Sequence, residues 1–374
     1  MNENPLVRLN RMGQSVWYDN IRRGLLESGE LRTMVRAGEL RGVTSNPTIF
    51  ENAIARTDEY RSAIQALAKK GYSAEQAYEQ LALEDIRAAA DVFLPVFEES
   101  GGADGYISLE VSPTLATDPE ATRKEAARLK QAVDRPNLMV KIPGTLDCLD
   151  AIRQAIADGI CVNVTLLFSV SRYRKVMEAY AAGLEDRQSR GLPLDSVASV
   201  ASFFVSRLDT LIDKGLDQMA GDERLSSSEL KALRGKAAIA NTRLAYQEFL
   251  AFRAGQRWSQ LSAHGARLQR PLWASTSTKD PAYPDTYYVE ALIAPDSVNT
   301  MPPATVAAYR DHGDPAVRIE DDLDAARELP GRLAKIGISL DQVTTQLETD
   351  GIASFQRSFQ SMLAVVENQL SGTR

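Results

Sequence analysis

Short apolar runs with β-strand character alternate with long helical patterns along most of this 374-residue chain. We expect eight strands, at residues 16–19, 42–46, 106–110, 138–142, 162–165, 197–202, 272–276 and 287–293. Strands that alternate with helices form a parallel sheet, so the pattern predicts an α/β fold, and eight units favour a closed (β/α)8 barrel. An open doubly wound sheet is the structural alternative, but no strand is followed by the Gly-x-Gly-x-x-Gly turn that marks a dinucleotide site.

Three helical stretches exceed what a minimal barrel of about 250 residues requires. Residues 56–99 predict two or three helices divided at Gly71, residues 226–252 predict one long helix, and residues 323–370 predict further helices after the last strand. No internal repeat, low-complexity tract or Pro/Gly-rich linker divides the chain. We therefore expect residues 1–374 to form a single barrel domain, with a helical insertion at about 56–99 and C-terminal helices at about 323–370, in preference to two domains.

The charge and the cysteine and histidine content exclude several classes of protein. Lys and Arg total 43 against 50 Asp and Glu, and this net charge of −7 argues against nucleic-acid or anionic-membrane partners. Cys148 and Cys161 lack a metal-type spacing, and His264 and His312 lie far apart, so neither a disulfide scaffold nor a multi-histidine metal site is expected. No apolar run has membrane-spanning length, and the chain starts without signal-peptide features, so we expect a cytoplasmic protein.

One lysine stands where a buried strand ends. Residues 137–145 read Asn-Leu-Met-Val-Lys-Ile-Pro-Gly-Thr, and Lys141 has apolar neighbours on both sides. A buried ammonium group is costly unless it is paired or loses its proton, and the neutral amine is the nucleophile that Schiff-base chemistry needs. Two structural interpretations stay open beside this one: a lysine whose head group reaches the solvent, and a lysine paired with a structural carboxylate.

Polar side chains also stand at the carboxyl ends of neighbouring strands, although the strands of a parallel sheet are usually apolar. Several of them stand two residues apart, and residues at this spacing share one face of a strand. In a barrel these strand ends converge on one mouth, where active sites lie. Single residues of this kind are often caps or turn formers, but several together predict a site. They are Asp19, the pairs Thr44 and Asn46, Ser108 and Glu110, Asn163 and Thr165, and Ser202.

Two cationic residues follow later strands. Arg207 comes shortly after Ser202, where a strand passes into a helix, and a helix N-terminus with an arginine suits a phosphate group. The structural alternative is a surface arginine paired with Asp209 or Asp213. Lys279, which follows the strand at 272–276, is a second candidate for the same role.

In sequence order, Asp19, Asn46, Glu110, Lys141, Asn163, Thr165, Ser202 and Arg207 resemble the active-site pattern of the transaldolase family, in its longer-chain branch. The most specific pieces are Val-Thr-Ser-Asn-Pro at 43–47 and Asn-Val-Thr-Leu-Leu-Phe-Ser at 163–169. The resemblance implies a class I Schiff-base aldolase barrel of the non-oxidative pentose phosphate pathway, a transferase that needs no metal or organic cofactor. It implies transfer of a dihydroxyacetone unit from sedoheptulose 7-phosphate to glyceraldehyde 3-phosphate, giving erythrose 4-phosphate and fructose 6-phosphate.

The resemblance also assigns roles to residues. Lys141 would form the Schiff base, Glu110 and Thr165 would hold a catalytic water molecule, and Asp19 would exchange the proton of the donor's C4 hydroxyl. The remaining family positions would bind substrate hydroxyls and phosphate: Thr44, Asn46, Asn163, Ser202 and Arg207. Where shorter members of the family have a second arginine, this chain has Ala-Ser-Thr-Ser-Thr-Lys at 274–279, so Lys279 would replace that charge at a different distance.

Two alternatives remain at this point. The first is a fructose 6-phosphate aldolase-type lyase, which shares the barrel and the lysine, although such lyases tend to lack a carboxylate at the position of Glu110. The second is a non-catalytic barrel that binds sugar phosphates. Small-molecule sugar phosphates are the expected partners, and the sequence leaves a homodimer and a monomer equally open.

Overall fold

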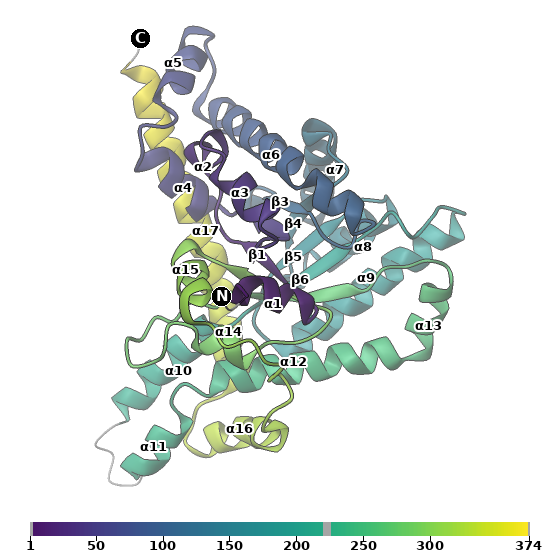
Figure 1. Cartoon of the computed structure of the whole chain (residues 1–374), viewed down its shortest axis with the longest axis vertical. Helices are drawn as coiled ribbons and strands as arrows, with labels where there is room; N and C mark the ends of the chain where they lie inside the picture. The colour runs from purple at the N-terminus through teal and green to yellow at the C-terminus, as the bar shows by residue number, and fades with distance from the viewer. Residues whose placement is uncertain (1–2, 220–225, 373–374) are drawn as a thin grey trace.

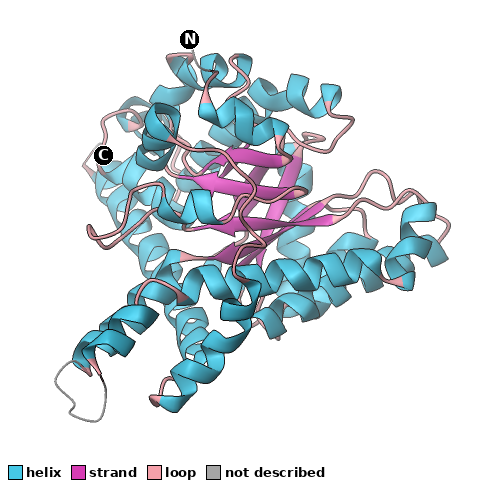
Figure 2. Cartoon of the chain, turned by 60° about the horizontal axis from the view of Figure 1, so that its bottom comes forward, coloured by secondary structure: helices cyan, strands magenta, loops and turns pink. Residues whose placement is uncertain are grey.

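The computed structural model of the chain describes residues 3–219 and 226–372. Within these ranges eight parallel strands close into a barrel in their sequence order, with β8 beside β1. Figure 2 shows these strands at the centre with helices around them. The expected (β/α)8 fold is therefore confirmed. The strands are β1 (Gln14–Tyr18), β2 (Gly42–Thr44), β3 (Ile107–Glu110), β4 (Leu138–Pro143), β5 (Val162–Leu167), β6 (Ser199–Phe204), β7 (Gln269–Ala274) and β8 (Ser297–Met301).

Helices cover the outside of the barrel and extend beyond it (Figure 1). The helices are α1 (Pro5–Arg11), α2 (Arg23–Glu27), α3 (Glu30–Arg36), α4 (Pro47–Ala55), α5 (Arg61–Lys69), α6 (Ala74–Glu99), the 3-10 helix η1 (Pro113–Leu115), α7 (Pro119–Val133), α8 (Leu149–Ala157), α9 (Val170–Ser189), α10 (Ser206–Gln218), α11 (Ser227–Leu233), α12 (Ala237–Ala254), α13 (Gln256–Ala263), α14 (Tyr287–Ala291), α15 (Pro303–His312), α16 (Leu323–Lys335) and α17 (Leu340–Ser371). Within the described ranges no helix has the length and apolar character that a membrane crossing needs.

The barrel interior contains polar side chains that bond to one another. The Gln14 side-chain amide donates to the Ser297 hydroxyl at 3.0 Å, and Gln269 donates to Ser199 at 2.8 Å. All four side chains are buried, so each hydrogen bond offsets part of the desolvation of its groups. The outer faces of the strands are apolar because helices cover them.

The eighth strand does not lie at residues 287–293, so that prediction is wrong. These residues contain α14 instead, and β8 follows it. Aromatic and β-branched residues are typical of strands, but here the hydroxyl groups of Tyr287 and Tyr288 donate to the Gly235 carbonyl and to Asp209. Tertiary contacts of this kind override a weak local preference.

The sequence pattern missed β8 because the strand is largely polar. Asn299 accepts a hydrogen bond from Thr276 at 2.8 Å, and Thr300 bonds to Thr44 at 2.6 Å across the interior. Thr44 belongs to β2 and Thr276 follows the end of β7, so a strand of this composition becomes stable only inside the closed barrel.

The single long helix expected at residues 226–252 is also not found. The chain instead forms α11 and α12, with a break near Gly235. Gly235 has a φ of 68°, a left-handed conformation that favours glycine. The Asp213 carboxylate accepts a hydrogen bond from its amide at 3.0 Å, so α10 fixes the position of the break.

The C-terminal helix α17 crosses from the barrel mouth to the insertion at 56–99. It contacts α4, α5, α6 and α10, and Figure 1 shows it running beside α4 and α5 toward the end of the chain. Elements more than 200 residues apart therefore meet at one edge of the barrel. This contact places residues of α17 close to the carboxyl ends of the strands.

Candidate active site

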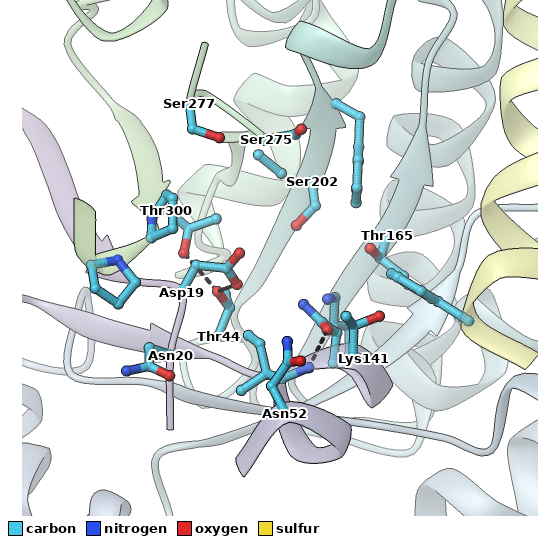
Figure 3. A pocket seen from close by; sticks show the side chains of 18 of the residues that line it. Asp19, Asn20, Thr44, Asn52, Lys141, Thr165, Ser202, Ser275, Ser277 and Thr300 are labelled. Carbon is cyan, nitrogen blue, oxygen red and sulfur yellow. Dashed lines mark hydrogen bonds between the residues drawn. The ribbon is translucent and has the colours of Figure 1, made fainter. Parts of the chain in front are cut away.

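A cavity of about 550 Å³ lies at the carboxyl ends of the strands (Figure 3). Most of the site residues predicted from the sequence belong to its wall. Glu110 and Asn163 do not line this cavity and lie beneath it. The lining residues that were predicted are Asp19, Thr44, Asn46, Lys141, Thr165, Ser202, Arg207 and Lys279.

Strand register explains why Lys141 meets Glu110. The parallel pairing of β3, β4 and β5 sets Glu110 beside Lys141 and Lys141 beside Asn163. The lysine Nζ lies 3.5 Å from Glu110 Oε2 and donates to the Ser45 carbonyl at 3.1 Å. The Lys141 side chain is only 5% exposed, so its head group does not reach the solvent.

Glu110 is a buried carboxyl group that is poised to titrate at neutral pH. Burial raises its pKa to about 7, although the positive charge of Lys141 acts in the opposite direction. Apart from the ion pair with Lys141, neither oxygen of the carboxyl group has a hydrogen-bond partner among the described residues. The same holds for the buried hydroxyl of Thr165. Buried polar groups of this kind are unusual unless a ligand or a water molecule satisfies them.

Asp19 lies on the opposite wall of the cavity, just after β1. The Thr44 hydroxyl donates to Asp19 Oδ1 at 2.6 Å, and Thr300 in turn bonds to Thr44 at 2.6 Å (Figure 3). Burial raises the pKa of Asp19, whereas the charge of Lys141 and the bond from Thr44 lower it. This hydrogen-bonded chain fixes the orientation of the carboxyl group.

Asn163 lies beneath the cavity floor. The Ser202 hydroxyl donates to its Oδ1 at 2.7 Å, and its own amide donates to the Ser108 hydroxyl at 2.9 Å. Asn163 is completely buried, so the structure gives it a supporting position under Ser202. Asn46, in contrast, lines the cavity while its Oδ1 accepts from the Ile49 amide and caps α4, so its side-chain NH₂ stays available to a ligand.

Two cations face the cavity near Asp19. The Arg207 guanidinium lies 5.2 Å from the ring centre of Phe204, and Lys279 donates to the Ser277 hydroxyl at 2.7 Å. Burial lowers the pKa of both groups, and the Arg207 charge lowers that of Lys279 further. Two like charges in the wall of one cavity favour the binding of an anion.

The surface ion pair considered for Arg207 does not form among the described residues. Asp209 accepts from the Ala238 amide at 2.7 Å and from Tyr288 at 3.0 Å. Asp213 accepts from Gly235 and from Tyr283. Both carboxylates face away from the cavity and hold α10 to its neighbours.

Sequence reasoning missed two lining residues that contact the central ones. Thr300 was not predicted because the eighth strand was placed at residues 287–293. Only the polar pattern of residues 297–301 could have indicated Thr300. Phe355 comes from α17, and its ring centre lies 5.9 Å from Lys141 Nζ. Nothing local in the sequence distinguishes Phe355 from a core residue of an amphipathic helix.

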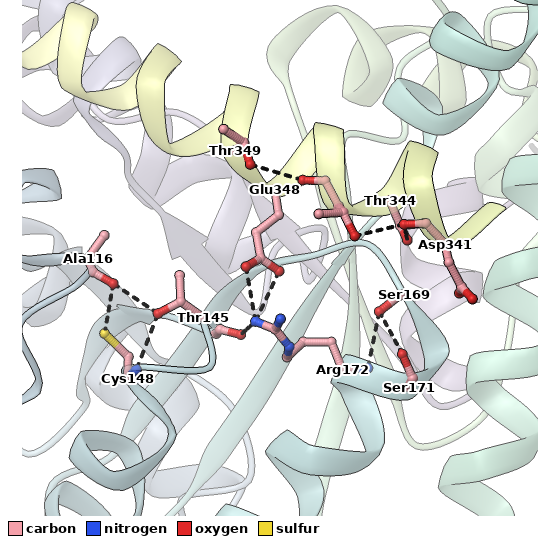
Figure 4. Close-up of polar contacts among 12 residues, drawn as sticks. Ala116, Thr145, Cys148, Ser169, Ser171, Arg172, Asp341, Thr344, Glu348 and Thr349 are labelled. Atoms are coloured by element: carbon pink, nitrogen blue, oxygen red, sulfur yellow. Dashed lines mark hydrogen bonds and ion pairs between the residues drawn. The ribbon is translucent and has the colours of Figure 1, made fainter. Parts of the chain in front are cut away.

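An ion pair fastens the start of α17 to the barrel (Figure 4). Arg172 lies 3.0 Å from Glu348 Oε2 and donates to the Gly144 carbonyl at 2.8 Å. Glu348 is half-buried, and burial raises its pKa although Arg172 acts in the opposite direction. Gly144 follows β4, so this contact couples α17 to the turn that follows Lys141.

Together these groups provide an amine nucleophile, two buried carboxyl groups for proton transfer and a cationic pair for an anion. The cavity is large enough for a sugar phosphate, and its hydroxyl and amide groups suit a substrate with several hydroxyls. The arrangement matches covalent catalysis on a phosphorylated carbonyl compound.

Comparison with known proteins gives matches over nearly the whole chain. The profile of the Transaldolase/Fructose-6-phosphate aldolase family matches residues 16–366. A transaldolase of Trichodesmium erythraeum is 47% identical over 372 residues, and one of Thermobifida fusca is 48% identical over 368 residues; each alignment covers 98% of both chains. A protein of Nostoc punctiforme named Transaldolase 2 is 46% identical and covers 99% of this chain and 98% of its own.

Proposed function

The chain belongs to the transaldolase and fructose-6-phosphate aldolase family, and we propose that it is a transaldolase that works through a Schiff base on Lys141. Its proposed reaction moves a dihydroxyacetone unit from sedoheptulose 7-phosphate to glyceraldehyde 3-phosphate, giving erythrose 4-phosphate and fructose 6-phosphate. The observation that carries the proposal is the buried Lys141, 3.5 Å from Glu110 in the wall of a cavity that it shares with Asp19.

Covalent bonding to Lys141 provides the electron sink. Its amine adds to the ketone carbon of the donor, and loss of water gives a protonated imine. Cleavage of the C3–C4 bond then leaves an enamine instead of a bare carbanion. The Phe355 ring lies over the lysine, and the Ser45 carbonyl accepts a hydrogen bond from the lysine Nζ. Both contacts support a fixed position for the nitrogen.

Two carboxyl groups would divide the proton transfers. Glu110, with Thr165, is proposed to hold the water molecule that carries protons during imine formation and hydrolysis. Support comes from the side-chain oxygens of Glu110 and Thr165, which have no hydrogen-bond partner among the described residues apart from the Glu110–Lys141 ion pair, and from the pKa of Glu110 near 7. Asp19 is proposed to take the proton of the C4 hydroxyl during cleavage and to return it to the acceptor. Thr44 orients it at 2.6 Å.

The polar lining is proposed to bind the substrate. Asn46 and Ser202 would bond the hydroxyls of the dihydroxyacetone unit, with Thr44 and Asn163 supporting them. Arg207 and Lys279 would bind the phosphate group at the far end of the cavity. Support comes from two cationic side chains in the cavity wall, neither of which forms an ion pair with a carboxylate among the described residues.

Borohydride trapping with fructose 6-phosphate tests the proposal. We expect an adduct of one dihydroxyacetone unit on the peptide that contains Lys141, read by intact mass and peptide mapping. Lys141→Arg should give no adduct, since a guanidinium group cannot act as a neutral amine nucleophile. Lys279→Arg is the matched control in the same cavity and should still be trapped. An adduct on Lys141→Arg, or none on the folded wild-type protein, would refute the Schiff-base assignment.

A second measurement separates transferase from lyase. With fructose 6-phosphate and erythrose 4-phosphate, and without borohydride, we expect sedoheptulose 7-phosphate and little free dihydroxyacetone. Release of dihydroxyacetone at the rate of donor cleavage would indicate the lyase activity instead.

A further inference from the structure

A second cavity lies behind Glu110, on the side away from the substrate cavity. Its volume is about 320 Å³, and α4, α6, α7, η1 and α17 form its walls. Glu110 belongs to its wall but not to the wall of the first cavity, whereas Asn46 belongs to both. Exposed residues stand at its rim, among them Thr114 and Arg128, so this cavity reaches the solvent on its own side of the barrel.

Two polar side chains of this cavity wall, Glu110 and Tyr78, have few or no hydrogen-bond partners among the described residues. Both oxygens of Glu110 lack a hydrogen-bond partner among the described residues, apart from the ion pair with Lys141. Tyr78, on α6, lines the same cavity, and its hydroxyl makes no hydrogen bond to any described residue. Its ring is held edge-on between Phe50 and Phe359, at 5.7 Å from each. Burial raises the pKa of Tyr78, and the Glu110 charge adds to this effect.

Hydroxyl groups also lead from the rim toward Glu110. Ser112 and Thr114 follow Glu110 at two-residue intervals, and their hydroxyls lie 2.8 Å apart. Both residues line the second cavity. The cavity wall is mixed, and its volume is large enough for several water molecules, each of which needs two to four polar partners of this kind.

The proposed chemistry requires water to move on the Glu110 side. When Lys141 forms the protonated imine, the new C–N bond replaces the C2–O bond of the donor. That oxygen takes up two protons, one from the amine nitrogen and one through the water held by Glu110, and leaves as water. Hydrolysis of the product imine takes up one water, which forms a new C2–O bond as the C–N bond breaks. In the proposed reaction the sugar phosphate would occupy the first cavity during both steps, and Phe355 lies over Lys141 there.

We infer that the second cavity is the path by which water and protons exchange between Glu110 and the solvent, with Tyr78 as the residue that positions this water. This inference rests on the proposed function. It gives the two entrances different tasks: the mouth of the barrel admits sugars, and the cavity between α6 and α7 admits water. Keeping bulk water out of the mouth protects the enamine from protonation.

Oxygen-18 at C2 of fructose 6-phosphate reports the path directly. The label leaves as water when the imine forms, and it reappears at C2 of the sedoheptulose 7-phosphate product only if that same water is used again. For the wild-type protein we expect most of the label to be lost to the solvent. The label is read in the product by mass spectrometry, before free ketose exchanges its carbonyl oxygen.

Two variants close the path at different depths. Thr114→Trp adds bulk at the exposed rim, with Thr114→Ala as the matched control. Ala82→Phe places a ring inside the cavity from the buried face of α6. For folded Thr114→Trp and Ala82→Phe we expect several-fold more retained label than for the wild-type protein. The donor KM should be unchanged. Wild-type retention in both folded variants would overturn the inference, as would full retention in the wild-type protein.

Tyr78→Phe tests the hydroxyl while it keeps the ring between Phe50 and Phe359. Losing one hydrogen bond to the water chain should slow imine formation by roughly three- to tenfold, without a change in donor KM. The pH midpoint of imine formation should also move, since Tyr78 and Glu110 interact. An unchanged rate and pH profile would remove Tyr78 from the path. If the wild-type protein forms no product at all, the proposed function fails first, which is a distinct result.

Discussion

At the residue scale, the proposed function makes the ionisation of Glu110 the event that controls imine formation. Its desolvation outweighs the attraction of Lys141, and its pKa rises to about 7. An ionised carboxyl group can accept the proton that leaves during imine formation, whereas a protonated one cannot. If Glu110 has its proposed role, the rate of imine formation over the neutral range should follow the ionisation of this group.

We expect the single-turnover rate of imine formation to rise with pH through a midpoint near 7, because the folded protein must release the Glu110 proton first. Rapid-quench borohydride trapping across the neutral range measures this rate. Glu110→Gln should lower the rate by about 10²- to 10⁴-fold and remove the rise, since an amide does not titrate. A variant that kept the same midpoint would show that another group controls it.

The cationic pair makes a second prediction at this scale. Arg207→Ala should lower kcat/KM for fructose 6-phosphate by roughly 10- to 100-fold, the loss of a charge-assisted contact, with much less effect on unphosphorylated fructose. Lys279→Ala should act in the same direction. Steady-state kinetics with both donors checks this, with the exposed Lys236→Ala as control. Equal losses for the two donors would take Arg207 out of the phosphate site.

At the element scale, α17 is part of the site although it lies at the end of the chain. Phe355 reaches Lys141, while Thr48 bonds to Ser358 at 2.9 Å and ties the helix to α4. Near its start, the Arg172–Glu348 contact fixes the helix to the turn after β4 (Figure 4). The position of the Phe355 ring over Lys141 therefore depends on a few polar contacts of α17.

Arg172→Ala should loosen the start of α17 and admit water to the enamine. The contact is partly buried, so its loss should reduce the free energy of unfolding by about 1–3 kcal/mol. We expect faster proteolysis within α17 and a larger share of free dihydroxyacetone per turnover. Arg174→Ala, two residues along α9 in an exposed ion pair with Glu248, is the matched control. If both variants released the same amount of dihydroxyacetone, the contact would have no role in covering the site.

At the scale of the whole molecule, the two ends of the barrel have different tasks. The proposed catalytic groups lie at the carboxyl ends of the strands, whereas a polar cluster closes the amino ends. There Asp104 accepts hydrogen bonds from Trp17 at 3.1 Å and from Arg270 at 2.9 Å, and Arg270 also donates to Ser15 at 2.8 Å. Mutations at the amino ends should therefore change the stability of the fold without changing the activity.

Arg270→Ala should lower the free energy of unfolding by about 3–5 kcal/mol, because it leaves the Asp104 carboxylate buried without its cation. The kcat at 25 °C should stay near the wild-type value. Chemical denaturation and steady-state kinetics measure the two quantities. Arg253→Ala, in an exposed pair with Asp296, should cost less than about 1 kcal/mol. A large loss of kcat in the folded Arg270→Ala variant would contradict this division.

The amino-acid sequence by itself determined the barrel class and most of the central site. Alternating apolar runs and helices are local patterns, and a strand end such as Lys141 or Glu110 can be read from a few residues. Because all parallel strands in a barrel end at one mouth, these local predictions were enough to place the residues in one site. The roles of the individual site residues remain proposals, as does the single domain.

Only the tertiary structure decided the features whose partners lie far away in the chain. β8 is stable as a strand because Thr300 and Asn299 find hydrogen-bond partners on β2 and just after β7. The cover of Phe355 over Lys141 and the second cavity behind Glu110 arise where α17 and α6 pack against the barrel. Such contacts leave no periodic trace in the sequence, since their energy comes from the burial and pairing of groups that only the closed fold brings together.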